Sequence, residues 1–416
     1  MMYLIRIALR NLLRRRSRTL VIGSILAIAV VFFLLIESVM VAMMDLSFKN
    51  AIDFETPHIE VSRQGLIDEE AKGNVVPLEE TFSISNSTEE TIAGLADYQA
   101  ATPVLDFSAD FIAGRYTFPV LVRSIEPDSF SQVFYHDQYV QTGAFLETGQ
   151  SGVVIGERLA QFFDLDVGDY FTLRFRDRQG SFNTMEGEVR GILATPHPDM
   201  NLRTVFVDRE AAASRLGLAN DAANRWMVRL TQRGSAPEQS QELQASLSNS
   251  QLVARSYREA AEFLVAVEAW GYIETYFILA LFLLVGAVGI VAAVILSALE
   301  RVSEIGIMKA MGLRENEIVR VFVIEAGGIG LVGGLIGCIL GALSVGLFVI
   351  YGFDMSFFLD IDAMSAFPLQ GRLYGAWNTS SFFFILAVVV AIALLSSLLP
   401  AYTAAKKDPI EAIRRR

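Results

Sequence analysis

The stretch Glu300–Leu313, ERVSEIGIMKAMGL, lies between two long apolar runs and carries charges of both signs. Its apolar residues Val302, Ile305, Met308 and Met311 recur every three residues, which is helical spacing. The plainest interpretation is a short amphipathic connector. A charged helix held at a membrane surface between two spanning helices can also receive force from a soluble partner and pass it to both spans. We favour this second interpretation, a rigid lever.

The composition indicates a membrane protein. The chain has 416 residues, 53% of them hydrophobic, and a mean hydropathy of +0.42, which is too apolar for an ordinary soluble protein. The single cysteine, Cys338, and three histidines cannot supply a disulfide framework or a Cys/His zinc site, so we expect no metal site. The net charge of −12 does not suit a nucleic-acid binder, and we expect no nucleic-acid partner.

Four apolar stretches approach or exceed the roughly 20 residues that cross the hydrocarbon core of a membrane. The expected order is a cytoplasmic amphipathic helix (1–19), a first span (20–44), an extracytoplasmic domain with a stalk (45–274), a second span (275–299), a cytoplasmic coupling helix (300–317), a third span (318–351), an extracytoplasmic loop (352–379), a fourth span (380–402) and a cytoplasmic tail (403–416).

Short basic segments decide the expected orientation. The N-terminal segment is rich in arginine and has no acidic residue, and the tail is also basic, which places both ends in the cytoplasm. The first apolar run is longer than the hydrophobic region of a typical signal peptide, so we expect an uncleaved anchor. Residues 45–274 contain 18 basic and 35 acidic residues, which is compatible with export of this domain but does not decide it. The N-terminal arginines are Arg6, Arg10, Arg14, Arg15, Arg16 and Arg18.

Within the insert, alternating apolar residues predict strands near 58–62, 120–125, 170–175, 188–193 and 205–207, with helices over 157–163 and 209–216. His197 and Asp199 lie together in a predicted loop. No activated Ser or Cys and no second His is placed to complete a catalytic or metal site with them, so we expect no catalytic residue and no enzyme activity on this chain.

Three segments carry a family resemblance. They are E-I-G-I-M-K-A-M-G at 304–312, V-I-G-E-R-L-A followed by V-G-D within 154–169, and P-A-x-x-A-A-K-x-D-P-I-E-A-I-R at 400–414. Together they resemble the ABC transporter permease family that includes MacB-like, FtsX-like and lipoprotein-releasing subunits of the LolC and LolE type. The resemblance implies four transmembrane helices and a large α+β extracytoplasmic domain, a MacB-like periplasmic core domain, inserted between the first and second helices.

The resemblance also implies how such a chain works. The sequence lacks a G-x-x-x-x-G-K-[ST] loop, so ATP and Mg are expected on a separate ABC ATPase dimer and no cofactor on this chain. A second permease chain, identical or different, would complete the assembly in the bacterial inner membrane, in contact with membrane lipids. In this family ATP hydrolysis moves the extracytoplasmic domains, a mechanism called mechanotransmission.

The resemblance leaves the substrate open. The length of the chain and the lack of a fused ATPase favour release of lipoproteins from the inner membrane, with a periplasmic chaperone as partner. One alternative is export of drugs, peptides or other hydrophobic molecules through an outer-membrane component. Another is regulation of a cell-wall hydrolase.

Two sets of residues inside the spans are candidates for function or packing. Phe33 and Glu37 are four residues apart, hence on one helix face, and could line a substrate site or pack against the second span around Gly286 and Gly289. Small residues four apart in the third span allow close approach of another helix, and ordinary packing is the expected role. They are Gly333, Gly337 and Gly341.

The coupling segment gives the first testable prediction. Ile305 and Met308 should be apolar anchors in a groove of the ATPase, and Glu304 and Lys309 rim charges, and Gly312 is assigned to the same coupling segment. Apolar anchors should dominate because exposed charges are typically worth less than about 1 kcal/mol each. Ile305→Glu or Met308→Glu should therefore abolish co-purification of the ATPase while the permease stays folded. Normal co-purification and normal stimulation of ATP turnover in both variants would contradict this assignment.

Overall fold

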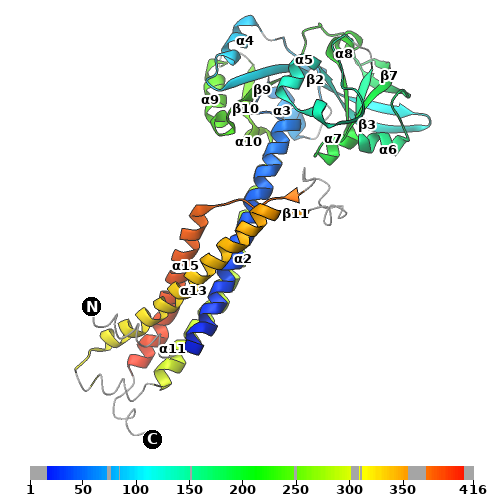
Figure 1. Ribbon diagram of the computed structural model, residues 1–416. Helices are drawn as coiled ribbons and strands as arrows, with labels where there is room; N and C mark the ends of the chain where they lie inside the picture. Colours follow the sequence, from blue (N-terminus) through cyan, green and yellow to red (C-terminus); the bar gives the residue numbers. More distant parts are fainter. Residues whose placement is uncertain are drawn as a thin grey trace. The chain divides into compact units, whose positions relative to one another are not determined.

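The computed structural model describes residues 16–72, 76–83, 85–149, 152–247, 251–300, 309, 312–354 and 372–406 (Figure 1). Contacts divide the chain into two compact units. One contains residues up to Met43, Glu268–Asp354 and the residues from Arg372 on, and the other contains Met44–Val267. Most of the expected N-terminal helix, most of the coupling helix, the central part of the 352–379 loop and the end of the tail lie outside the described residues.

The first unit is built from four helices that are long and apolar enough to cross a membrane. Each predicted span lies within one of these helices, and each helix is longer than its predicted span, because the polar ends of the helices do not register as hydrophobic sequence. A short strand pair, β11 (Phe353–Asp354) with β12 (Arg372–Leu373), lies between the last two helices in the sequence. The four helices are α2 (Arg16–Phe54), α11 (Glu262–Glu300), α13 (Glu315–Tyr351) and α15 (Thr379–Ala405).

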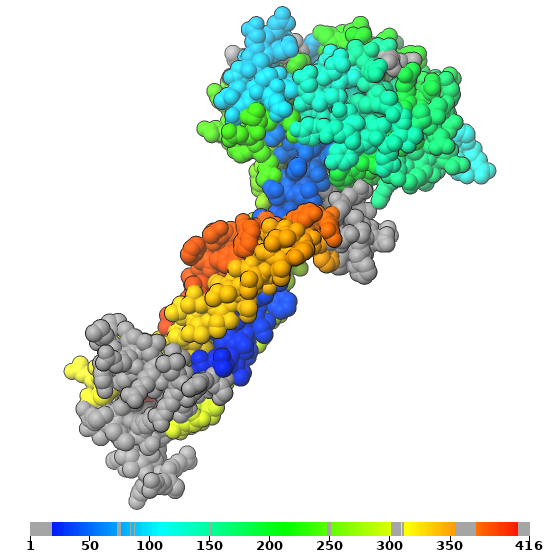
Figure 2. Space-filling model, viewed as in Figure 1, coloured from blue at the N-terminus to red at the C-terminus, as the bar shows by residue number. Residues whose placement is uncertain are grey.

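Glycines on α13 form two rows, each in close contact with one neighbouring helix, and Figure 2 shows the atoms of α13 lying against those of α2. A Cβ atom on Gly333 would lie 2.8 Å from the carbonyl oxygen of Gly23, and one on Gly337 would lie 2.6 Å from Cβ of Val30. Gly341 faces Leu34 in the same way. The four-residue spacing therefore marks the face of α13 that packs on α2. A second row faces α15 and comprises Gly327, Gly330 and Gly334.

The second unit contains a ten-stranded sheet in which β6 pairs with two strands. The order is β10-β1-β9-β2-β3-β8-β5-β7-β4, with β6 joining β2 to β7. The strands are β1 (Ile59–Arg63), β2 (Tyr98–Ala113), β3 (Tyr116–Ile125), β4 (Val140–Gly143), β5 (Val153–Gly156), β6 (Tyr170–Arg176), β7 (Phe182–Leu193), β8 (Thr204–Asp208), β9 (Arg225–Leu230) and β10 (Leu252–Ser256).

Six of these strands close into a barrel. The circuit β2-β3-β8-β5-β7-β6 returns to β2 because β6 pairs with β2 as well as with β7. Alternate residues point inward and form one apolar core, which is the arrangement that removes exposed strand edges. The core includes Phe107, Phe111, Val122, Phe171 and Leu173. Phe111 and Phe171 stack with ring centroids 4.2 Å apart.

The helices of this unit are interspersed among the strands along the chain. The predicted helices 157–163 and 209–216 coincide with α6 and α8, and each predicted strand overlaps an observed one. The expected α+β class is met only in part, because helices and strands are interspersed and the sheet has parallel as well as antiparallel pairs. The helices are α3 (Gln64–Ala71), α4 (Asn86–Ala93), α5 (Pro127–Val133), α6 (Glu157–Phe163), α7 (Pro198–Arg203), α8 (Arg209–Leu216), α9 (Ala236–Ser246) and α10 (Tyr257–Ala260), with 3-10 turns η1 (Leu78–Glu80), η2 (His136–Tyr139) and η3 (Arg233–Ser235).

The packing of α13 on α2 predicts that an added methyl group lowers stability at a glycine on the contact face and not at a glycine with free space around it. Gly337→Ala should destabilise the full chain by about 1–3 kcal/mol, because the new Cβ would meet the Ala27 backbone, which cannot move aside. Gly289→Ala on α11 is the matched control, since no heavy atom lies within 4 Å of its added Cβ. The midpoint of SDS-induced loss of helical circular dichroism measures both changes. Equal midpoints for the two variants would contradict the close contact.

Candidate functional site

The described part of the coupling region shows how the segment ends. Gly312 has a φ of +93° and donates its N–H to the carbonyl oxygen of Lys309 at 2.9 Å, so this glycine closes the turn in a left-handed conformation that favours glycine. Glu317 then accepts the Arg314 N–H at 2.9 Å at the start of α13. Lys309 lies 3.6 Å from the carboxylate of Glu315.

The three remaining coupling candidates, Glu304, Ile305 and Met308, lie outside the described residues. Their role, and that of Lys309 and Gly312 in binding an ATPase, stays a prediction.

Glu37 connects the first and fourth predicted spans. It is 4% exposed, and its Oε1 accepts hydrogen bonds from Asn378 Nδ2 and Ser381 Oγ, each at 3.1 Å. Asn378 and Ser381 lie at the N-terminus of α15, where the helix dipole favours a carboxylate. The neighbouring Ser38 donates its hydroxyl to the Ala376 carbonyl oxygen at 2.9 Å and accepts the Ala376 N–H at 3.1 Å. Together these contacts bind α2 to the start of α15.

Phe33 lies on the same face of α2 as Glu37 and is 3% exposed. Its ring centroid is 6.5 Å from that of Tyr276 on α11 and 6.3 Å from that of Phe384 on α15. Both candidate lining residues are therefore packed among helices of this chain, which supports the packing alternative, although the partners differ from those expected. Gly286 faces Leu26, and nothing lies within 4 Å of a Cβ on Gly289. The lining role stays a prediction.

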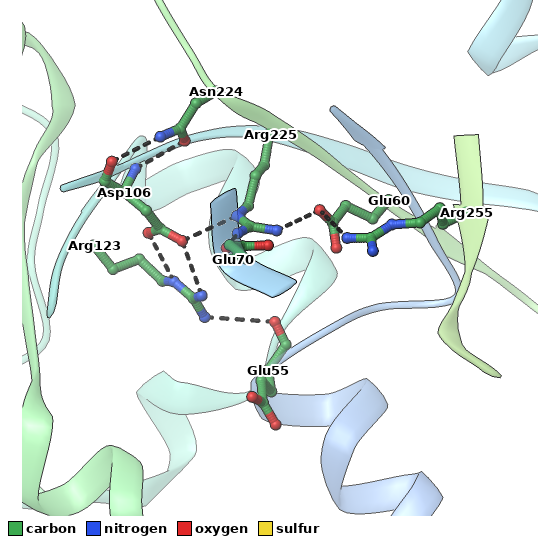
Figure 3. A network of polar contacts seen from close by, with 8 residues as sticks. All are labelled: Glu55, Glu60, Glu70, Asp106, Arg123, Asn224, Arg225 and Arg255. Atoms are coloured by element: carbon green, nitrogen blue, oxygen red, sulfur yellow. Dashed lines mark hydrogen bonds and ion pairs between the residues drawn. The ribbon is translucent and has the colours of Figure 1, made fainter. Parts of the chain in front are cut away.

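A buried network of charges forms the polar centre of the second unit (Figure 3). The strand register places Asp106 of β2 opposite Arg123 of β3, and Arg123 Nε and Nη2 donate to Asp106 Oδ1 and Oδ2, each at 3.1 Å. Arg225 Nε lies 3.3 Å from Asp106 Oδ2. The Asn224 side chain holds the Asp106 backbone through hydrogen bonds of 2.9 and 2.7 Å. Asp106, Arg123 and Arg225 are all at least nine-tenths buried.

The same network reaches β1, which follows α2 in the sequence, and β10, which is separated from α11 by the short helix α10. Glu60 of β1 and Arg255 of β10 are register partners, and Arg255 Nη2 donates to Glu60 Oε1 at 3.3 Å. Arg225 also contacts the carboxylates of Glu60 and Glu70. Burial raises the pKa of Glu60, but Arg225 and Arg255 outweigh burial and hold that pKa below its ordinary value. Glu60 thus has two arginine partners.

The last residues of α2 and the residue after it are bound by a second group of contacts. Arg229 of β9 donates to Asp53 Oδ1 and to the Val133 carbonyl oxygen, both at 2.7 Å.

His197 Nε2 lies 3.1 Å from Glu55 Oε2. Burial lowers the pKa of His197, but the hydrogen bond and charge of Glu55 outweigh burial and raise it above its ordinary value. His197 thus has a structural partner, and no group of three metal-ligating side chains occurs in the described part of the chain.

The contacts of Glu60, Arg225 and Arg255 hold β1 and β10, the strands of the sheet that lie nearest to α2 and α11 in the sequence. Strands β1 and β10 pair with each other through Glu60 and Arg255, and Arg225 of β9 binds Glu60 of β1 and Asp106 of β2. Sequence reasoning missed this site. A charged residue inside an apolar strand, such as Glu60 or Arg229, is a signal that could have been used, but it does not identify a partner more than 100 residues away.

The network predicts a large effect from loss of its central arginine. Arg225→Ala should destabilise the second unit by about 3–5 kcal/mol, because Glu60 and Asp106 would be left buried and incompletely paired. Arg174→Ala is the control, since its pair with Asp110 is 45% and 37% exposed and is worth about 0.2–1 kcal/mol. Amide hydrogen exchange of β1, β9 and β10 measures the difference. Unchanged protection in Arg225→Ala would overturn the assignment.

Comparisons with known proteins agree with this architecture. The family model of the MacB-like periplasmic core domain matches residues 19–246, more than half of the chain, and that of the FtsX-like permease C-terminal matches residues 276–409. An ABC transporter permease of Methanocaldococcus jannaschii is 34% identical over 135 residues, which are 32% of this chain and 31% of that protein.

Two further relatives differ in how much of each chain they match. The lipoprotein-releasing system transmembrane protein LolC of Xylella fastidiosa is 22% identical over 336 residues, 79% of each chain. The macrolide export ATP-binding/permease protein MacB of Vibrio parahaemolyticus is 36% identical over 133 residues, 32% of this chain and 18% of that protein. With both family models matched in the order of the domain and the helices, the chain belongs to the family of ABC transporter permeases with a MacB-like periplasmic core domain and an FtsX-like C-terminal region.

Proposed function

We propose that this chain is one of two permease subunits of an inner-membrane ABC transporter that releases lipoproteins from the membrane. ATP hydrolysis on a separate ATPase dimer would move the extracytoplasmic domains of the pair. The observation that carries the proposal is the extent of the match to LolC, which covers 79% of both chains and so includes domain and helices together. The matches to the MacB proteins are limited to about a third of this chain.

The ATPase is proposed to be a separate polypeptide. The sequence contains no phosphate-binding G-x-x-x-x-G-K-[ST] loop, so none of its residues can cradle the phosphates of ATP in that way. The relative from Vibrio parahaemolyticus is described by its name as both ATP-binding and permease. In this chain the coupling segment around Lys309 and Gly312 would receive the movement of the ATPase instead.

The buried charge network supports a mechanical role for the domain. Glu60 and Arg255 bind β1, which follows α2 in the sequence, to β10, which precedes α10 and α11, so these two strands are held together at one place on the sheet. Arg229 adds a contact to Asp53, in the last turn of α2. A displacement of either helix end would therefore be passed to the barrel instead of being absorbed in a flexible loop, as mechanotransmission requires.

Export of hydrophobic molecules is the second candidate. The match to the macrolide exporter has the higher identity, 36%, although it is short, and the domain model matched is named after MacB. An exporter would use the same coupling and the same charge network. The two candidates differ in the transported molecule and in the expected partner, which is a periplasmic chaperone for lipoprotein release and an outer-membrane component for export.

The test is reconstitution of the full chain with its co-purified ATPase in proteoliposomes that contain a fluorescent acylated lipoprotein. Lipoprotein release should require ATP and an added soluble acceptor, and the lipoprotein should stimulate ATP hydrolysis. The matched control is the same protein without its acyl chains, which should do neither. Stimulation by a macrolide or another hydrophobic compound, with none by the lipoprotein, would favour export. Release in the absence of ATP would contradict both transport functions.

A further inference from the structure

We propose that His197 is a pH-sensitive switch between the start of α7 and the residue that follows α2. Its imidazole makes one contact through each ring nitrogen. Nδ1 accepts the Met200 N–H at 3.3 Å and so caps the N-terminus of α7, and Nε2 lies 3.1 Å from Oε2 of Glu55. The cap requires that Nδ1 carries no proton, whereas the contact with Glu55 gains strength when the ring is charged.

The neutral imidazole satisfies both contacts at once. A carboxylate oxygen only accepts, so Nε2 donates its proton to Glu55, and Nδ1 keeps a lone pair for the Met200 N–H. Protonation places a second proton on Nδ1, and both ring nitrogens are then donors. Nδ1–H then faces the Met200 N–H, a donor against a donor, and the cap is lost. The contact with Glu55 becomes an ion pair, in which the attraction of opposite charges adds to the hydrogen bond.

The surroundings of His197 set the pH range of this exchange. Burial lowers the pKa of His197, but the hydrogen bond and the charge of Glu55, with a further contribution from Asp199, raise it above its ordinary value of 6.5. Arg123 of β3 opposes this rise. The folded-state pKa therefore lies above the unfolded one, and the ion pair contributes stability that is present below the unfolded pKa and is lost as the pH rises through the folded pKa. The cap on α7 has the opposite dependence.

The elements around α7 supply the other charges near this ring. Helix α7 packs against α6, β3, β5 and β8, and β5 carries no ionisable residue. Within α7, Asp199 pairs with Arg203 at 3.1 Å. Nε2 of His136, on η2, lies 3.2 Å from Sδ of Met200. The remaining ionisable side chains on these elements are Glu157 and Arg158 of α6, Tyr116 and Arg123 of β3, and Asp208 of β8.

The other two histidines of the chain titrate in a different range. Burial and the charge of Arg123 hold the pKa of His136 well below 6.5. Burial, followed by the charges of Arg229 and Arg233, lowers the pKa of His58 to about 4. A histidine transition near neutral pH is therefore that of His197.

The loop before α7 keeps its place in both states, because its hydrogen bonds involve no ionisable group. Asn201 Nδ2 donates to the Thr195 carbonyl oxygen at 2.8 Å, and the Thr195 N–H donates to Asn201 Oδ1 at 2.9 Å. The His197 N–H donates to Thr195 Oγ1 at 3.3 Å. The backbone of His197 is thus fixed, and only its side chain changes partners. Acid pH loosens the first turn of α7 and holds Glu55, the residue after α2, more tightly.

The test measures amide hydrogen exchange of the full chain in nanodiscs, by mass spectrometry of peptides that cover α7, from about pH 8.5 to about pH 5.5. Protection factors, corrected for the effect of pH on intrinsic exchange, should fall about fivefold in α7 toward acid pH, the ratio expected from loss of one N-cap. The midpoint should lie above pH 6.5. A parallel loss of protection in β8 would contradict a change confined to α7.

Two variants separate the cap from the ion pair. His197→Asn keeps a side-chain acceptor at the N-cap position but cannot be protonated, so protection of α7 should no longer depend on pH. Glu55→Gln keeps an acceptor for Nε2 but removes the charge, so the transition should persist with its midpoint lowered by about one pH unit or more. The control Glu210→Gln removes an exposed carboxylate of α8 and should titrate like the wild type.

Three results would overturn the proposal: a wild-type profile without a transition, the same transition in His197→Asn, or an unshifted midpoint in Glu55→Gln. A gain of protection in α7 toward acid pH would also refute it, because the charged ring would then stabilise the helix. None of these measurements involves an ATPase or a substrate, so their outcome is independent of the proposed transport function.

Discussion

Burial of Glu60 and Asp106 is the constraint on which the second unit depends. Each is 1% exposed, and a buried carboxylate costs several kcal/mol unless its charge is paired and its oxygens are hydrogen-bonded. Arg225 contacts both, so this one side chain requires β1, β2 and β9 to keep a single register. A slip of one residue would turn every charge of the slipped strand to the opposite face. The network therefore specifies the alignment of β9 with β2 and with β1, the strand that follows α2 in the sequence.

The parts of the fold that sequence reasoning predicted are those set by local patterns. The spacing of Gly333, Gly337 and Gly341 predicted a close-packed face, and the structure places that face against α2, because in a membrane helices associate through close packing of small residues. The helices α6 and α8 coincide with the predicted helical ranges 157–163 and 209–216. The four long apolar helices follow from hydrophobic length alone.

The parts that were missed depend on contacts between residues distant in sequence. Glu37 was predicted to line a substrate site or to pack against the second span, but its partners Asn378 and Ser381 are more than 340 residues away, and no local pattern connects them. Glu60 and Arg255 are 195 residues apart and meet only because β1 lies between β9 and β10. Closure of the barrel through the double pairing of β6 is equally non-local, since strand alternation does not reveal which edges meet.

Helix α2 is held by three kinds of contact that differ in the free energy needed to break them. Between Gly23 and Leu34 it packs on the glycines of α13, and at Glu37 and Ser38 it is hydrogen-bonded to the start of α15. At Asp53 it is bound by Arg229. Sliding of apolar surfaces exchanges one set of van der Waals contacts for another, whereas separating Asp53 from Arg229 leaves two buried charges unpaired. Separating Asp53 from Arg229 therefore costs more free energy than exchanging one apolar contact of α2 for another.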